Sequence, residues 1–129
     1  MTHKSHAQEQ AKAQYESILE MLQRVKHAKT EEEYEEAQEA IQEDPLSVNV
    51  RSGWYEPGTP EHSAEEYCIL LCFGGPAVRI VGKLDQYAQP ETATLECQDW
   101  GTLWESWKGM TGAVEDTLLE YANGFYFGE

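Results

Sequence analysis

Apolar positions recur with a helical period over the first third of the chain. Between residues 8 and 28 they fall every three or four positions, which predicts an amphipathic helix with one apolar stripe. That stripe consists of Ala11, Tyr15, Ile18, Leu19, Leu22 and Val25. Thr30 followed by Glu33 is the pattern of a capping box, so we expect a second helix to start directly after Thr30. Pro45 should end it, because a proline pushes the preceding residue out of the α region. Residues 8–44 are therefore expected to form an antiparallel helical hairpin.

After the predicted hairpin, apolar positions recur every two residues instead of every three or four. Residues 46–55 alternate in character, which predicts a strand with one face in water. Residues 67–73 are a continuous apolar run that ends at Gly74-Gly75-Pro76, and they predict a central strand with Ile69, Leu71 and Phe73 facing inward. Two more strands are expected over residues 77–81 and 92–98. A four-stranded antiparallel meander over residues 46–98 is the economical arrangement.

The last third of the chain is rich in tryptophan. Asp99-Trp100-Gly101 has the composition of a turn, and Trp104 and Trp107 follow at helical spacing. A final helix is expected over residues 113–123, with Gly124 as its stop signal. The aromatic tail 125–127 should pack back on the body. The sequence thus predicts one α+β domain, residues 1–129, made of a helical hairpin (8–44), an antiparallel sheet (46–98) and a tryptophan-rich segment with a C-terminal helix (99–129).

Charge adds the strongest functional hint. The chain carries 24 Asp and Glu against nine Lys and Arg, a net charge of −15. Such a field repels nucleic acid and anionic membranes and attracts basic protein surfaces. The alternative is that the acidity only keeps the protein soluble.

The second predicted helix concentrates this charge. Eight acids and no basic residue fall within the 14 residues from 31 to 44. At a rise of about 1.5 Å per residue this is about one charge per 2.6 Å, comparable to about one per 1.7 Å along duplex DNA. A functional anionic surface and an ordinary solvated face both remain open. The candidate partner-binding acids are Glu31, Glu32, Glu35, Glu36, Glu39, Glu43 and Asp44.

Two apolar features are further candidates. Asp99, Trp100 and Trp104 could form a partner-binding anchor, since tryptophan is enriched at interface hot spots, although core filling is the alternative. The second face of the predicted sheet carries Cys68, Leu70, Cys72, Ala77 and Val81, which is too apolar to leave in water. We expect the tryptophan-rich segment and the last helix to cover it, or a second copy or a partner to do so.

Catalytic, metal and cofactor signals are lacking. Cys68, Cys72, Cys97 and His62 invite a zinc site, but four residues of strand span about 13 Å, so Cys68 and Cys72 could not share one ion. No nucleophile elbow, phosphate-binding glycine loop or His-Glu-x-x-His motif occurs. We expect no enzyme activity, no catalytic residue, no metal and no cofactor. The odd number of cysteines and the absence of a signal-like or membrane-spanning stretch favour the cytoplasm.

Parts of the chain resemble small acidic proteins of bacteriophages and prophages. The similar stretches are residues 50–55, 74–82, 98–101 and 125–129. No activity or site residue can be transferred from such proteins. The resemblance implies a context that includes anti-CRISPR and antirestriction inhibitors, some of which mimic DNA. The resulting hypothesis is an inhibitor that occludes a basic host nuclease or defence effector without binding nucleic acid or membrane; the alternative is a non-catalytic structural or regulatory homo-oligomer, such as a homodimer, that uses the apolar sheet face.

Overall fold

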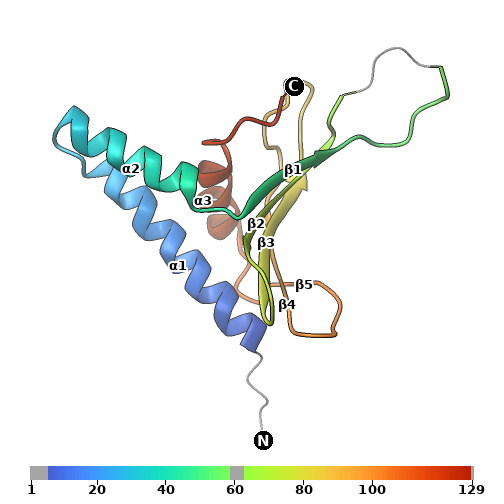
Figure 1. Ribbon diagram of the computed structural model, residues 1–129, viewed down its shortest axis with the longest axis horizontal. Helices are drawn as coiled ribbons and strands as arrows, with labels where there is room; N and C mark the ends of the chain where they lie inside the picture. Colours follow the sequence, from blue (N-terminus) through green and yellow to red (C-terminus); the bar gives the residue numbers. More distant parts are fainter. Residues whose placement is uncertain (1–5, 59–62, 129) are drawn as a thin grey trace, which may run out of the picture.

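The computed structural model describes residues 6–58 and 63–128 and shows two layers, with helices on one face of an antiparallel sheet (Figure 1). The predicted α+β class and the order of helical hairpin, strands and C-terminal helix are confirmed. In chain order the elements are α1 (His6–Lys26), α2 (Glu31–Glu43), β1 (Ser47–Arg51), β2 (Glu66–Cys72), β3 (Ala77–Lys83), β4 (Thr94–Gln98), β5 (Glu105–Ser106) and α3 (Gly112–Ala122).

The strands form a meander in the order β1-β2-β3-β4-β5, each antiparallel to the next. The prediction of four strands was one short, because the two-residue strand β5 pairs with the edge of β4. Trp104 and Trp107 flank this strand instead of sharing one side of a helix. Trp107 packs against Tyr15 of α1 at a ring distance of 5.2 Å, whereas Trp104 lies under the guanidinium of Arg79 on the other face.

A bulge in β2 changes the orientation of its last residues. Leu70 pairs with Arg79, but the next pair joins Cys72 to Val78, so β2 contains one extra residue there. Cys72 consequently packs against the core beside α1, and its expected place on the outer face is wrong. Phe73, which was expected to face inward, lies beyond the strand and is 78% exposed.

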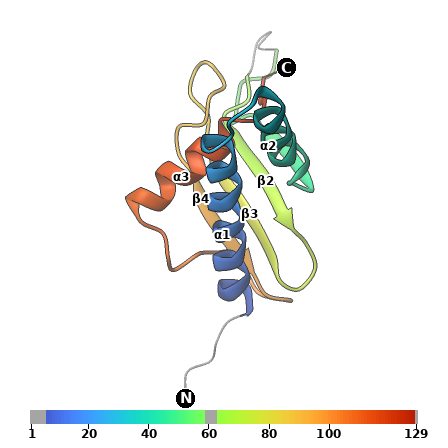
Figure 2. The ribbon, with the colours of Figure 1, turned by 90° about the vertical axis from the view of Figure 1, so that its left-hand side faces the viewer.

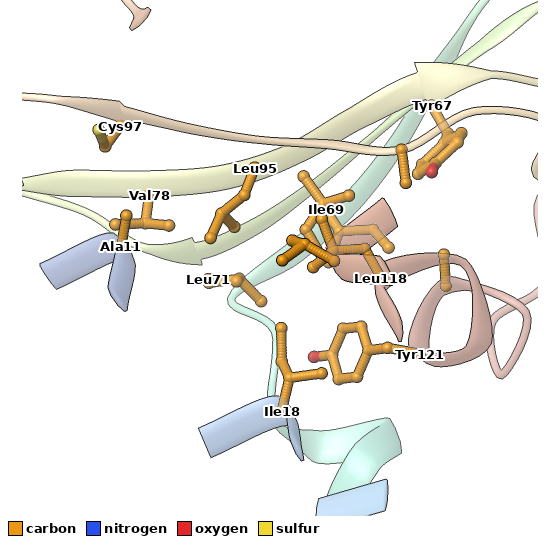
Figure 3. Close-up of a cluster of buried hydrophobic side chains, with 14 of the residues drawn as sticks. Ala11, Ile18, Tyr67, Ile69, Leu71, Val78, Leu95, Cys97, Leu118 and Tyr121 are labelled. Carbon is orange, nitrogen blue, oxygen red and sulfur yellow. The ribbon is translucent and has the colours of Figure 1, made fainter. Parts of the chain in front are cut away.

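The core lies between the sheet and the helices (Figure 3). Side chains of α1 and α3 meet the inner face of β2, β3 and β4. The helices contribute Ala11, Ile18, Leu118 and Tyr121, and the strands contribute Ile69, Leu71, Val78, Leu95 and Cys97. Burying each large apolar side chain contributes about 1.5–3 kcal/mol, so this layer stabilises the fold. The predicted stripe of α1 is confirmed, since its members are all buried or half-buried.

The helical hairpin is fixed by the cap at the start of α2 and by the buried residues of this helix. Thr30 accepts a hydrogen bond from the Glu33 N–H at 3.0 Å, and the Glu33 carboxylate accepts one from the Lys29 N–H at 2.8 Å. Thr30 therefore caps this helix as predicted, and the Glu33 carboxylate reaches back to the residue before the cap, Lys29, instead of to Thr30 itself as in a standard capping box. Ala37 and Ile41 are its buried residues. Figure 2 shows α1 running along the sheet, with α2 and α3 on the same side of the sheet as α1.

The aromatic tail packs as predicted. Phe127 is buried, and its ring lies 4.9 Å from that of Tyr67 on β2. Its neighbour Tyr126 remains exposed.

Candidate partner-binding surfaces

The acids of α2 gather on one face of the helix. At about 100° per residue, six glutamates fall within an arc of about 140°. The buried residues Ala37 and Ile41 lie on the opposite side, toward the rest of the protein. The six are Glu31, Glu32, Glu35, Glu36, Glu39 and Glu43, and all of them are exposed.

Four of these glutamates form one row that is inclined to the helix axis. Glu31, Glu35, Glu39 and Glu43 follow one another at intervals of four residues, so the Cβ atoms of neighbours lie about 6 Å apart along about 18 Å of helix. Glu32 and Glu36 form a shorter row beside it. We call this set of six residues the acidic face of α2.

No basic side chain of the described residues neutralises the acidic face. The ion pairs between described residues are Lys26–Glu120, Arg51–Glu66 and Arg79–Glu96, and none of them includes a residue of α2. The other two acids of the segment have structural partners. Glu33 accepts a hydrogen bond from the Lys29 N–H, and Asp44 accepts one from the Tyr121 hydroxyl at 2.7 Å.

The predicted aromatic anchor lies elsewhere on the molecule. The loop that follows β4 leaves the sheet on the side opposite α2 (Figure 1). Within it, Asp99 accepts a hydrogen bond from the Ala7 N–H at 3.0 Å and so caps the start of α1. Trp100 is 86% exposed next to Gly75, and Trp104 is half-buried against Arg79. The structure therefore does not bring Trp100 and Trp104 together with the acidic face.

Two turns near Trp100 carry further exposed apolar side chains. Phe73 from the β2–β3 turn and Leu103 from the loop after β4 are 78% and 89% exposed. Gly74 and Gly101 adopt positive φ angles of 120° and 79°, which only glycine takes readily, and so form the two turns that present these side chains. The sequence indicated both turns and missed the exposure of Phe73.

No helix of the described residues covers the outer face of the sheet. Contrary to expectation, α3 packs on the same face of the sheet as α1, and Trp104 is the large side chain that reaches the outer face over Arg79. This face is also more polar than the sequence suggested, because Asn49, Arg79, Thr94 and Glu96 lie on it beside Cys68, Leu70 and Val81. It contains a hollow of about 460 Å³.

The cysteines are separate and unoxidised. Cys68 faces the hollow, whereas Cys72 and Cys97 lie on the side of the helices. Burial raises the pKa of all three thiols, that of Cys97 to about 11, so they stay protonated at neutral pH. His62, considered above as a metal ligand, lies outside the described residues; within residues 6–58 and 63–128 no group of three or more His, Cys, Asp and Glu could hold a metal ion.

No helix of the described chain combines the length and apolar character that crossing a bilayer requires. In comparisons with known proteins, the chain matches no family model, no curated protein and no solved structure.

Proposed function

We propose that the protein is a non-catalytic inhibitor that presents the acidic face of α2 to a basic surface of a nucleic-acid-handling protein. The observation that carries this proposal is the row of exposed glutamates on one face of one helix, without any ion pair to the described Lys and Arg. In this role the acidic face occupies the place that a nucleic-acid backbone would take on the target.

The energetics of α2 support a role outside folding. Like charges three and four residues apart on a helix each cost about 0.2–0.5 kcal/mol. Acids in the first turn gain from the helix dipole, but Glu39 and Glu43 lie beyond it. The acidic face therefore costs stability, and it gains only when a cationic partner binds.

The target class follows from charge and shape. The six glutamates of the acidic face lie along about 18 Å of helix, or about one charge per 3 Å, which offers a basic cleft roughly half the charge density of duplex DNA. Long-range attraction also speeds the encounter of oppositely charged proteins. The target proposed here, a host nuclease or defence effector, is also the one that the resemblance of residues 50–55, 74–82, 98–101 and 125–129 to small acidic phage proteins implies. We place the protein in the cytoplasm, that of the host cell if a phage encodes it.

The test is competition with DNA for basic nucleases and defence effectors. The variant changes Glu31, Glu35, Glu39 and Glu43 to Gln, which removes the row and keeps the side-chain shape. The matched control changes four exposed acids outside α2 to Gln, namely Glu9, Glu16, Glu20 and Glu91. Both variants have the same net charge.

We expect the row variant to bind at least tenfold more weakly and the control to change affinity about twofold, because close charge pairs dominate over distant ones. Affinity of the natural protein should fall as salt rises. Equal loss in both variants would reduce the effect to net charge, and unchanged affinity in the row variant would remove α2 from the interface.

A further inference from the structure

The hollow on the outer sheet face has the size of a small-ligand site. Its volume of about 460 Å³ falls within the usual range of about 300–1,000 Å³ for such sites. Residues that pair across four neighbouring strands form its floor: Asn49 on β1, Cys68 on β2, Val81 on β3 and Thr94 on β4. The floor thus offers an apolar centre, Cys68 and Val81, with a polar residue at each side.

Charged residues border this floor on two sides. Arg51, Glu66 and Lys83 form the neighbouring cross-strand row at one side, and Arg79 pairs with Glu96 at the other. Glu66 and Leu70, which lie in these two rows on β2, are four residues apart, or about 13 Å along the strand. Of the four Lys and Arg residues that follow residue 30, three surround this hollow in an otherwise acidic chain.

A positive charge at one border of the hollow and a negative charge at the other can each bind a ligand. The Lys83 ammonium makes no ion pair with the described residues. On the other side, Arg79 binds one oxygen of Glu96, Oε1, through both Nε and Nη2, which leaves Oε2. The Trp104 ring, 4.0 Å from the Arg79 guanidinium, holds this pair in place, and the pair is less than one-third exposed.

We propose that the hollow binds a short peptide with free ends, with its carboxylate at Lys83, its ammonium at Glu96 and an apolar middle side chain on Val81 and Cys68. Three extended residues span about 10 Å. The rows that contain Lys83 and Glu96 lie about 13 Å apart along the strands, and both side chains line the hollow between them, so a peptide of this length fits. A net charge of −15 repels a simple anion, whereas a ligand with one charge of each sign has no net charge to repel. This inference does not depend on the role of α2.

The probe is the tripeptide alanyl-leucyl-alanine, titrated into the full chain and followed by backbone amide NMR shifts. We expect saturable shifts at Asn49, Cys68, Val81 and Thr94. N-acetylation or C-amidation of the peptide should each weaken binding about fivefold, the value of one partly exposed ion pair. Absence of saturation up to about 10 mM, or equal binding of the capped and free peptides, would overturn the proposal.

Paired variants test the orientation of the peptide. Lys83→Gln should weaken binding of the free peptide and leave binding of its C-terminal amide unchanged. Glu96→Gln should weaken binding of the free peptide and spare the N-acetyl form. The controls Lys12→Gln and Glu20→Gln change exposed residues of α1 and should affect neither peptide. Equal effects of Lys83→Gln on the free and amidated peptides would rule out the contact with the carboxylate.

Discussion

The hydroxyl of Tyr121 joins the last helix to the end of the acidic helix. The side chain is fully buried, and its O–H donates to the Asp44 carboxylate at 2.7 Å. A hydrogen bond to a charged group contributes more than one between neutral groups, about 1.5–3 kcal/mol. This single bond therefore helps to hold α2 against the body of the protein.

Tyr121→Phe should lower the free energy of unfolding by about 1–2 kcal/mol, because it removes this bond and leaves the ring packing intact. Urea denaturation measures the change. Tyr87→Phe is the control, since Tyr87 is 74% exposed and should give no change. Equal stability of the Tyr121 variant and the natural protein would show that the bond contributes nothing.

Two buried tyrosines make the fold sensitive to alkali. Burial raises the pKa of Tyr67 and of Tyr121 above the ordinary value of 10.0, and in Tyr121 the bond to Asp44 adds to the effect. Above about pH 10 the unfolded chain releases phenolic protons that the folded chain keeps. Stability from these groups is thus complete below that pH and is lost above it.

We expect the free energy of unfolding to fall above pH 10 by about 1.4 kcal/mol per pH unit for each of these tyrosines. Urea titrations at several pH values between about 9 and 11 measure the slope. Tyr121→Phe should reduce it, and Tyr87→Phe should not. An identical slope in all three proteins would contradict the assignment.

At the scale of elements, the N-cap Thr30 and the buried residues Ala37 and Ile41 hold α2 in place. The glutamates of its acidic face repel one another and act against this. Replacing Glu35 and Glu39 with Gln removes five like-charge neighbours at spacings of three and four residues. We expect this double change to raise the free energy of unfolding by about 1 kcal/mol at low salt. The gain should vanish at about 1 M salt, where charges are screened within about 3 Å.

The matched control for this prediction is Glu16→Gln on α1. Glu16 is exposed and lies four residues from both Lys12 and Glu20, so attraction and repulsion offset each other. Its replacement should leave stability unchanged. A gain that persists at high salt would show that helix propensity, and not repulsion, is responsible.

Most of the elements could be predicted because their patterns are local. The stripe of α1, the Thr30–Glu33 cap and the alternation of β4 each lie within a few turns or residues. The failures lie where distant contacts decide. Trp104 and Trp107 have the spacing of a helix, yet each finds a separate partner, Arg79 or Tyr15, on opposite faces of the sheet. The bulge that turns Cys72 inward has no signal in the apolar run that contains it.

The candidate sites divide in the same way. The acidic face of α2 follows from sequence spacing alone, because six exposed positions on one helix need no tertiary information. Asp99 was selected for its charge beside Trp100, but it caps α1, 92 residues away along the chain. The hollow between β1 and β4 depends on strand register and could not be read from the sequence.

At the scale of the whole molecule, the outer sheet face bears on the alternative function, self-association. Arg79 and Glu96 lie in the middle of that face, and burying them against a second copy would remove them from water. Copies of net charge −15 also repel one another. These two features favour a monomer.

Sedimentation should therefore show a single monomeric species at physiological salt. Leu70→Glu, on the outer face, should leave the sedimentation coefficient unchanged. A dimer that this substitution dissociates would instead support a homo-oligomer built through the sheet face.

The side chains of the six outward glutamates of α2 form no ion pair or hydrogen bond with the rest of the described chain. Glu31 and Glu32 gain from the dipole of α2, whereas no contact beneath Glu35, Glu36, Glu39 and Glu43 depends on the sign of their charge. Lysine at these four positions should therefore reverse the charge of the surface and leave the interior unchanged, and glutamine should remove the charge. The charge of this surface can thus change by substitution while the fold beneath it stays the same.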